Sequence, residues 1–305
     1  MLIEKAQPGN RPVLVGLIGP SSSGKTLSAL RMASGMVSGT NKRTTLIDTE
    51  NGRCLHYADR FDFDRIALDA PYSPERYCEA VGLALDASPG ALVIDQASFE
   101  HNGEGGVLDQ AESFLEAKCG DDWKKRDKLK MVSFAKPKQQ RRKLNLLLER
   151  ASNTCPIIVC YRGADKIKPE TGKGVVQMGL QPETTSPLIF EMSAQLLLPA
   201  GCNGVPKLYS DNPYECKHIK VPDYLAHIFP DGEQLTEETG ARLAEWARGD
   251  TIRRFDEARD LIESVATLDD LRAVWNDVNK RKREFSAAEF AKLAEMKDQR
   301  KGELS

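Results

Sequence analysis

The sequence predicts an α/β fold with a mainly parallel central sheet, followed by a small helical appendage. Three observations predict it. Apolar and β-branched runs at 13–18, 43–48, 91–95 and 156–161 alternate with segments of helical periodicity, as in strand–helix–strand units. The first run leads into a glycine-rich turn, and the next two end in aspartate. Residues 251–305 contain neither proline nor a strand-like run, so they predict helices alone.

Length and composition fit one large folded domain plus an appendage. The 305 residues are 40% hydrophobic and 29% charged, which is ordinary for a globular chain. Because the net charge is only −2, any surface for nucleic acid must be local. The sequence has no apolar run long enough for a bilayer and no signal-like N-terminus, so no membrane contact is expected. Seven scattered cysteines without a C-x-x-C pair predict a reducing, cytoplasmic setting.

The first turn, GPSSSGKT at residues 19–26, matches the phosphate-binding pattern G-x-x-x-x-G-K-[ST] without mismatch. Its glycines let the backbone turn so that successive N–H groups face one anion. The helix that follows directs the positive end of its dipole at the same point. A chance match in a Gly/Ser turn is the alternative, which the flanking strand and helix disfavour. The predicted nucleotide-binding residues are Gly19, Pro20, Ser21, Ser22, Ser23, Gly24, Lys25, Thr26 and Leu27.

Four side chains carry the predicted chemistry. Lys25 can bridge the β- and γ-phosphates of a nucleoside triphosphate, and the Thr26 hydroxyl can hold Mg²⁺. Asp95 ends a buried strand, from which one carboxylate can join the Mg²⁺ shell. Glu50 follows another strand at its carboxyl end, where it could orient the attacking water. Alternatively, Asp48 or Glu50 caps a turn, and spacing alone leaves the two interpretations about equal.

A strongly basic stretch covers residues 124–143, with Trp123 and Phe134 beside its lysines and arginines. Basic residues interleaved with aromatic ones suit a nucleic-acid backbone and stacked bases. The alternative is a solvated helix face above packed leucines, which this local pattern slightly favours. The candidate DNA contacts in the stretch are Lys136, Lys138, Arg141 and Arg142.

The other elements of the first 250 residues follow from periodicity and turn residues. The segment over 162–185 is expected to be a mobile loop with a short hairpin, because it is rich in glycine, lysine and proline. The predicted elements are a first helix that closes near Gly39, helices over 74–87 and 107–118, loops over 98–106 and 162–185, and strands over 188–198 and 206–221.

A change in pattern divides the chain into a core, residues 1–249, and a C-terminal helical tail, residues 250–305. A helix over 236–248 is stopped by Gly249, and three helices follow. Thr267 with Asp270 and Ser286 with Glu289 form capping-box patterns at the starts of the last two. The tail helices are predicted over 251–265, 268–280 and 287–302, with a seam formed by Leu271, Val274, Trp275, Val278, Phe290, Leu293 and Met296.

The order of these motifs resembles the ATPase core of RecA-type recombinases. It is more closely similar to compact RecA-core ATPases encoded by bacteriophages, which are grouped with phage single-strand annealing and recombination proteins. The resemblance covers residues 10–249 and rests on GPSSSGKT, LIDTEN (46–51) and ALVIDQAS (91–98), with looser later segments. It implies a RecA-like P-loop fold with antiparallel late strands, the cofactors ATP and Mg²⁺, and the cytoplasm of a phage-infected or lysogenic bacterial cell.

The resemblance also implies roles near the nucleotide. Glu50 matches the glutamate that activates the hydrolytic water, and Asp95 matches the acid that supports Mg²⁺. Tyr57 falls at the spacing of an aromatic residue that stacks on adenine. Cys54 stands where the family has an acid that reads the adenine amino group.

Further implied roles concern DNA and assembly. The loop over 164–184 matches one that contacts single-stranded DNA in the family, through Lys166, Lys168 and Lys173. Lys217 and Lys220 match a late strand whose two lysines reach the neighbouring subunit's γ-phosphate in RecA filaments, although the spacing here is K-x-x-K rather than K-x-K. Arg162 is the rival sensor or finger. The sequence also has Tyr161-Arg162 in place of the polar glutamine or asparagine that is usual at this position in the recombinases.

These patterns and the resemblance lead to one hypothesis and two alternatives. The hypothesis is a single-stranded-DNA-binding ATPase that assembles as a filament or ring and assists phage-type recombination or annealing. The C-terminal helices could then bind a phage or host replication or recombination protein. The first alternative is a P-loop kinase of a nucleotide or metabolite, with the basic stretch as its lid. The second is an ATP-gated adaptor of the helicase-loader type, which would use the tail as its partner surface.

Overall fold

Seven strands form one sheet within the described part of the computed structural model, residues 9–170, 174–229, 231–285 and 287–304. The sheet order is β3-β2-β4-β5-β1-β7, and β6 pairs with β5 outside this row. Pairings along the row are parallel, whereas β6 runs antiparallel to β5. The predicted α/β fold with a mainly parallel sheet is therefore confirmed. The strands are β1 (Leu14–Gly19), β2 (Thr44–Asp48), β3 (Phe63–Ala67), β4 (Ala91–Asp95), β5 (Ile157–Glu170), β6 (Gly174–Pro182) and β7 (Ala194–Leu197).

Helices cover both faces of this sheet. Helices α1 (Lys25–Val37) and α10 (Glu237–Arg248) join the apolar cluster on one face. Helices α2 (Pro74–Asp86) and α6 (Ala135–Ala151) join the cluster on the other face. Because strands between two helical layers are buried on both sides, they need apolar residues at successive positions. All residues of β1 and β4 are buried accordingly, which is why their sequences are continuous apolar runs.

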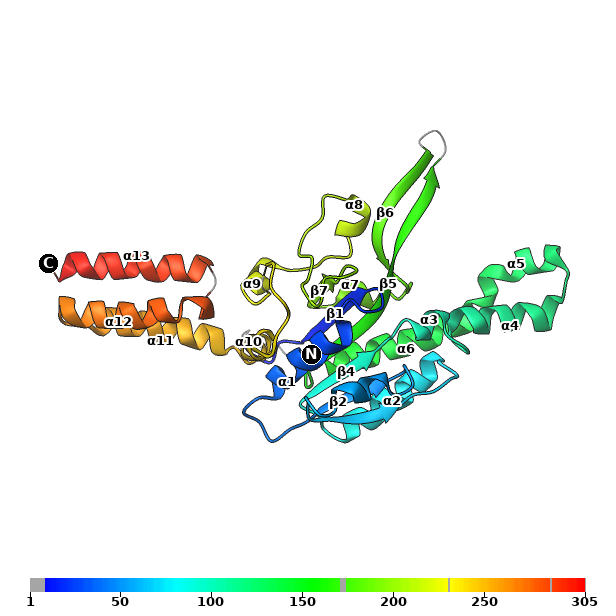
Figure 1. Ribbon diagram of the computed structural model, residues 1–305, viewed down its shortest axis with the longest axis horizontal. Coiled ribbons are helices and arrows are strands. Elements are labelled where there is room, and N and C mark those ends of the chain that lie inside the picture. The colour runs from blue at the N-terminus through cyan, green and yellow to red at the C-terminus, as the bar shows by residue number, and fades with distance from the viewer. Residues whose placement is uncertain (1–8, 171–173, 230, 286, 305) are drawn as a thin grey trace, which may run out of the picture.

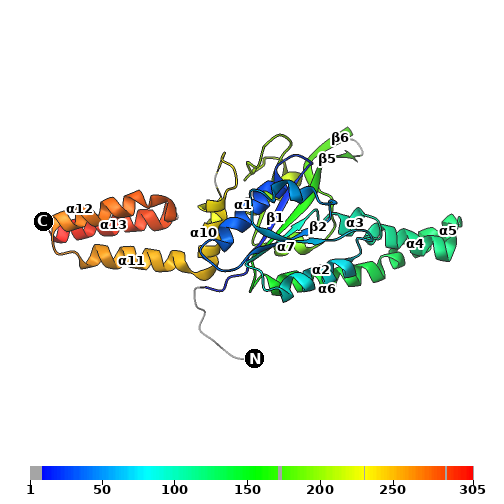
Figure 2. The same ribbon diagram turned by 60° about the horizontal axis from the view of Figure 1, so that its bottom comes forward.

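Three elements project from this core. In Figure 1, the hairpin (β5 and β6), the arm (α4, α5 and α6) and the tail (α11, α12 and α13) leave the sheet in different directions, and Figure 2 again places arm and tail at opposite ends. None of the described helices has both the length and the apolar composition that a membrane crossing requires. The remaining bounds are η1 (Arg53–Tyr57), α3 (Phe99–Asn102), α4 (Val107–Cys119), α5 (Trp123–Ser133), α7 (Leu188–Glu191), α8 (Pro213–Cys216), α9 (Asp223–Ala226), α11 (Asp250–Ser264), α12 (Leu268–Lys280), η2 (Lys282–Glu284) and α13 (Ala287–Glu303).

The tail has an apolar cluster of its own. All the predicted seam residues belong to it, and Ala258 and Ile262 of α11 join them. The Trp275 and Phe290 rings lie with their centroids 5.4 Å apart across the seam. Thr267 caps α12, since its hydroxyl accepts the Asp270 N–H at 3.1 Å. The predicted partner cap, Ser286, lies outside the described residues.

Three predicted elements differ in part from the structure, and one strand was not predicted. The expected loop over 98–106 contains the short helix α3. The hairpin expected within 162–185 is present but longer, because β5 continues beyond the sheet and β6 pairs with it. The expected strand over 188–198 begins with α7, and its strand portion, β7, pairs parallel with β1 rather than antiparallel. Strand β3 was not predicted, because charged and exposed residues interrupt its apolar pattern.

The expected strand over 206–221 is wrong. This segment holds α8 and two isolated bridges to the sheet, Gln195–Lys220 and Leu197–Lys207. Turn chemistry explains the error. Asn212 caps α8 by accepting the Tyr214 N–H, and the proline that follows has no N–H to give to a strand ladder.

Two glycines let α1 and α10 approach each other closely. A Cβ atom on Gly35 would lie 1.8 Å from the Glu237 carbonyl oxygen, and one on Gly240 would lie 1.9 Å from the Met32 carbonyl oxygen. Neither backbone can yield without moving its helix. The glycine pair therefore fixes the distance between the helix that follows β1 and the last helix of the core.

We predict that Gly35→Ala and Gly240→Ala each lower the free energy of unfolding by about 1–3 kcal/mol, because a methyl group would overpack this contact. Urea unfolding measures the change. Gly82→Ala is the matched control: Gly82 lies in α2 with no heavy atom within 4 Å of an added Cβ. It should gain roughly 0.5–1 kcal/mol from helix propensity. Equal effects of all three substitutions would contradict close packing at Gly35 and Gly240.

Candidate functional site

The carboxyl ends of β1, β2 and β4 meet around a small cavity of about 150 Å³. Parallel strands end at the same edge of the sheet, so the turns after them come together there. The lining contains four of the side chains that the sequence predicts to act together, and Tyr57. The lining residues are Ser21, Ser22, Gly24, Lys25, Thr26, Glu50, Arg53, Tyr57, Asp95 and Gln96.

The turn after β1 requires glycine at both ends. Gly24 has a φ of +93°, a left-handed conformation, and a Cβ on it would lie 2.8 Å from the Gly204 nitrogen. A Cβ on Gly19 would lie 2.2 Å from the Leu198 carbonyl oxygen. The segment after β7 therefore packs directly against this turn. Within the turn, the buried Ser23 Oγ forms no hydrogen bond with any described residue.

Lys25 is buried at the start of α1 and bends back over its own turn. Its Nζ donates hydrogen bonds to the carbonyl oxygens of Gly19 at 2.8 Å and Pro20 at 2.7 Å. Burial lowers the pKa of Lys25, and the nearby Cys160, Asp95 and Glu50 oppose that shift. The site thus places a cation among acidic groups at the edge of the sheet.

Asp95 lies beside Thr26 at the end of β4. The Thr26 hydroxyl lies 3.1 Å from Asp95 Oδ1 and 3.0 Å from Oδ2. Burial, and next the charge of Glu50, raise the pKa of Asp95 to about 6, against the opposing effects of Thr26 and Lys25. Among the described residues no cluster of three or more His, Cys, Asp and Glu could hold a metal ion. One hydroxyl and one carboxylate nevertheless fit Mg²⁺, which keeps several waters or phosphate oxygens as ligands.

Asp48 builds the turn that presents Glu50. Its Oδ1 accepts the Glu50 N–H at 2.8 Å, and its Oδ2 accepts the Gly52 N–H and the Arg65 Nε–H, both at 2.7 Å. Burial would raise the pKa of Asp48, but these hydrogen bonds lower it overall. Asp48 therefore caps a turn, as the alternative interpretation expected. This same turn brings the Glu50 side chain to the cavity.

Two residues that sequence reasoning missed hold the Glu50 carboxylate. Gln96 Nε2 donates to Glu50 Oε1 at 3.4 Å, and Arg53 Nη1 lies 3.3 Å from Oε2. Gln96 has a φ of +63°, which is strained for a long side chain. Its buried Oε1 has no hydrogen-bond partner among the described residues. The available signal was its place directly after the aspartate that ends β4.

The resemblance implies roles near the nucleotide for three further residues, of which one lines the cavity and two do not. Tyr57 is half-buried at the end of η1 and lines the cavity. Cys54 is fully buried in the core, where burial raises the pKa of its thiol to about 12. Arg162 lies outside the cavity: its N–H donates to Ser98 Oγ at 2.9 Å, and its guanidinium lies 3.8 Å from the Glu183 carboxylate.

The implied lysine strand does not form. Lys217 is exposed at the end of α8, in a helical turn instead of a strand. Lys220 is exposed at an isolated bridge, and its Nζ donates to the Phe190 carbonyl oxygen at 3.1 Å. The resemblance assigned both lysines to one late strand, and neither of them lies in such a strand.

The residues predicted to contact DNA differ in their exposure to solvent. Lys166 and Lys168 are exposed on the hairpin, and Lys136, Lys138 and Arg142 are exposed on α6. Lys173 lies outside the described residues. The surface role predicted for Arg141 is wrong, because its side chain is buried and pairs with Glu100 at 2.8 Å.

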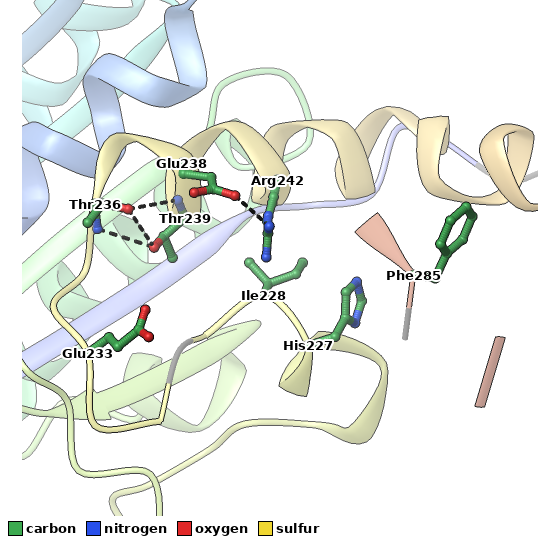
Figure 3. Close-up of a pocket in the computed structure, with 8 residues that line it drawn as sticks. All are labelled: His227, Ile228, Glu233, Thr236, Glu238, Thr239, Arg242 and Phe285. Carbon is green, nitrogen blue, oxygen red and sulfur yellow. Dashed lines mark hydrogen bonds and ion pairs between the residues drawn. The ribbon is translucent and has the colours of Figure 1, made fainter. Parts of the chain in front are cut away.

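Another hollow, of about 270 Å³, lies where the core meets the tail (Figure 3). It is lined by the start of α10, by residues between α9 and α10, and by Phe285. Thr236 and Thr239 form the capping box of α10, and Arg242 pairs with Glu238. These four side chains satisfy one another, whereas the buried His227 Nδ1 of the same lining has no hydrogen-bond partner among the described residues.

We predict that Asp95→Asn stabilises the nucleotide-free protein near neutral pH. A carboxyl with a raised pKa binds more protons in the folded state between its two pKa values, so stability falls as pH rises through that window. For Asp95 the window runs from 3.8 to about 6. Asparagine removes that loss, which amounts to about 3 kcal/mol. Urea unfolding in a chelator should show the gain at about pH 7.5 and not at about pH 3.5.

The control for this prediction is Asp59→Asn, which changes an exposed aspartate. It should leave stability almost unchanged at both pH values. If Asp95→Asn and the wild type unfold alike at the higher pH, the Asp95 carboxylate is not destabilised by its surroundings.

Comparison with known proteins identifies no family for this chain. No protein-family model matches the chain, and the search of curated proteins gives no match either.

Proposed function

We propose that this chain is an ATPase with a RecA-like P-loop core, which binds Mg²⁺–ATP in the cavity at the ends of β1, β2 and β4. The observation that carries the proposal is the convergence of Lys25, Thr26, Asp95 and Glu50 on that one cavity. A cation, a hydroxyl and two carboxylates are the groups that phosphoryl transfer to water requires.

The register of the sheet supports this assignment. Asp48 of β2 pairs with Asp95 of β4, so the residues that follow them, including Glu50 and Gln96, extend past the same edge. Strand β5 lies between β4 and β1, which sets the Lys25 turn one strand away. A terminal phosphate in the cavity would thus have the lysine on one side and the glutamate on the other.

Lys25 and the turn before it would hold the phosphates. The ammonium now donates to two backbone carbonyls, and phosphate oxygens could replace these acceptors. The unpartnered Ser23 Oγ is a further donor in the same turn. Mg²⁺, held by Thr26 and Asp95, would neutralise charge on the terminal phosphates when bound.

Glu50 would act as the general base. Its carboxylate accepts a proton from water as the water oxygen forms a bond to the γ-phosphorus and the bond to the bridging oxygen breaks, which releases ADP and phosphate. Gln96 would position this step. Its Nε2 already holds Glu50, and its unpartnered Oε1 can accept a hydrogen bond from the same water.

Single-stranded DNA is the proposed partner of the hairpin and the arm. Lys166 and Lys168 are exposed on the hairpin, and the arm carries exposed Lys136, Lys138 and Arg142. With a net charge of −2 for the chain, such local patches would bind phosphates in a salt-sensitive manner. Assembly as a filament or ring and a partner protein on the tail belong to the same proposal. A P-loop kinase is the less favoured function, because it would have to exclude the water that Glu50 would activate.

We predict that Glu50→Gln lowers ATP turnover by about 10²–10⁴-fold, since it removes the base and keeps the shape. Nucleotide binding, followed by fluorescence anisotropy, should persist. In the wild type, single-stranded DNA at low salt should stimulate turnover. Unchanged turnover in Glu50→Gln would favour a kinase or an adaptor, and turnover unaffected by DNA would count against the DNA-dependent role.

We also predict that Gln96→Ala lowers kcat about a hundredfold and leaves KM nearly unchanged, because the water loses its orientation. Gln96→Gly separates this role from a structural one. Because glycine tolerates the left-handed backbone, Gln96→Gly should be more stable than Gln96→Ala, yet it should be as slow as the alanine variant. Wild-type turnover in Gln96→Gly would mean that only backbone geometry matters at this position.

A further inference from the structure

A cavity of about 680 Å³ lies at the base of the arm, between α3, the start of α4, the α5–α6 junction and the segment after β6. Its lining residues differ from those of the proposed ATP site. This volume falls within the range of roughly 300–1,000 Å³ that is usual for small-ligand pockets. Neither the proposed hydrolysis nor the packing of the sheet uses it.

The walls of this cavity are apolar and open to solvent. Leu108 is 43% exposed and Met131 is 76% exposed, although both line the cavity. Phe134 lies half-buried at the junction of α5 and α6, and the Lys138 ammonium lies 5.6 Å from the centre of its ring. An aromatic ring beside a cation is a platform on which a flat, electron-rich group can stack.

A buried arginine orients the polar side of the cavity. Arg141 Nη1 donates to the Thr185 hydroxyl at 2.9 Å, and Arg141 Nη2 lies 3.1 Å from His101 Nδ1. Because arginine can only donate, His101 Nδ1 must accept. Burial, with the charges of Arg141 and Lys166, lowers the pKa of His101 to about 4, so the ring is neutral at physiological pH and carries its proton on Nε2.

Asn145 adds a second donor to the same lining. Its Oδ1 accepts the Ser186 hydroxyl at 3.1 Å, and no described residue accepts from its amide nitrogen. The cavity therefore combines apolar walls with two lining residues, His101 and Asn145, that each carry an N–H donor. Such donors fit a flat ligand that presents carbonyl or ring-nitrogen acceptors. An acyl chain would leave them unsatisfied.

The surroundings are cationic. Between residues 123 and 143 the sequence holds ten basic residues and one acidic residue. Lys138 and Arg142 belong to this set, and both line the cavity. The charge is far larger than one small anion would need, so it fits a polyanion.

We propose that this cavity takes one unstacked base of single-stranded nucleic acid, stacked on Phe134, with the neighbouring phosphates on Lys138 and Arg142. The base offers an acceptor to His101 Nε2–H or to the Asn145 amide, which every base can do through a carbonyl oxygen or a ring nitrogen. The inference rests on the proposed function for its choice of polymer. It requires no ATP turnover.

The test compares two labelled oligonucleotides of equal length, an oligothymidylate and the same backbone with abasic residues, by fluorescence anisotropy with the full chain. Wild type should bind the abasic strand about tenfold more weakly, the loss expected for one stacked base. Phe134→Ala should bind the oligothymidylate about tenfold more weakly and the abasic strand no worse than wild type does, since both changes remove the same contact. Val132→Ala, an exposed apolar residue outside the cavity, is the matched control and should bind both strands as wild type does.

The outcomes separate this inference from the proposed function. Equal binding of the two strands by wild type would overturn the base pocket and leave DNA binding intact. If neither strand binds, both the pocket and the DNA-dependent role fail. Binding to anionic phospholipid vesicles that is lost in Phe134→Ala, with equal binding of the two strands, would assign the cavity to a membrane surface instead. The abasic comparison needs no variant, so it can still overturn the proposal if Phe134→Ala does not fold.

Discussion

The fold depends on the hydrogen-bond and ion-pair partners of the charged side chains that are buried at one edge of the sheet. Lys25, Asp48 and Asp95 are each at most 9% exposed there. An uncompensated buried charge costs several kcal/mol, so each needs partners. Two carbonyls of its own turn hold Lys25, the Thr26 hydroxyl holds Asp95, and Arg65 with two backbone N–H groups holds Asp48. These partners fix the backbone of the turns after β1 and β2. The compensation is incomplete at Asp95, since its pKa remains raised, and a bound cation would complete it.

The segment that follows Asp95 connects this edge to the projecting elements. Gln96 donates to the turn after β2, and Ser98 accepts the N–H of a residue in β5. Glu100 pairs with Arg141 of the arm, and Asn102 donates to Glu183 after the hairpin. Breaking a buried pair such as Glu100–Arg141 costs about 3–5 kcal/mol, so this part of the network is stiff. A ligand that shifts the arm or the hairpin would therefore act on the residues that hold the Glu50 carboxylate.

The parts of this structure that the sequence predicts are those set by residues close together along the chain. Strands buried on both faces are continuous apolar runs, and the turn after β1 has a fixed chemical pattern, so both are predictable. Strand β3 is exposed and charged, and the segment over 206–221 is broken by an Asn-Pro pair, so periodicity fails for both. The role of Gln96 depends on a left-handed backbone and a neighbouring turn. The burial of Arg141 depends on Glu100, forty-one residues away in the sequence, which no local pattern reveals.

The amino-acid composition of the arm contributes little to the stability of the fold. Among the described residues of α5, Ser133 is the one that is buried, so this helix gains little from packing, and isolated helices of its length are marginal in water. Its apolar Trp123, Met131 and Val132 are largely exposed. The many cations nearby repel one another, which salt would screen in the free protein. The same screening weakens attraction to a polyanion. Salt therefore weakens both effects of these charges: it stabilises the free arm and lowers the affinity for a polyanion. A bound polyanion would relieve the repulsion that the arm otherwise carries.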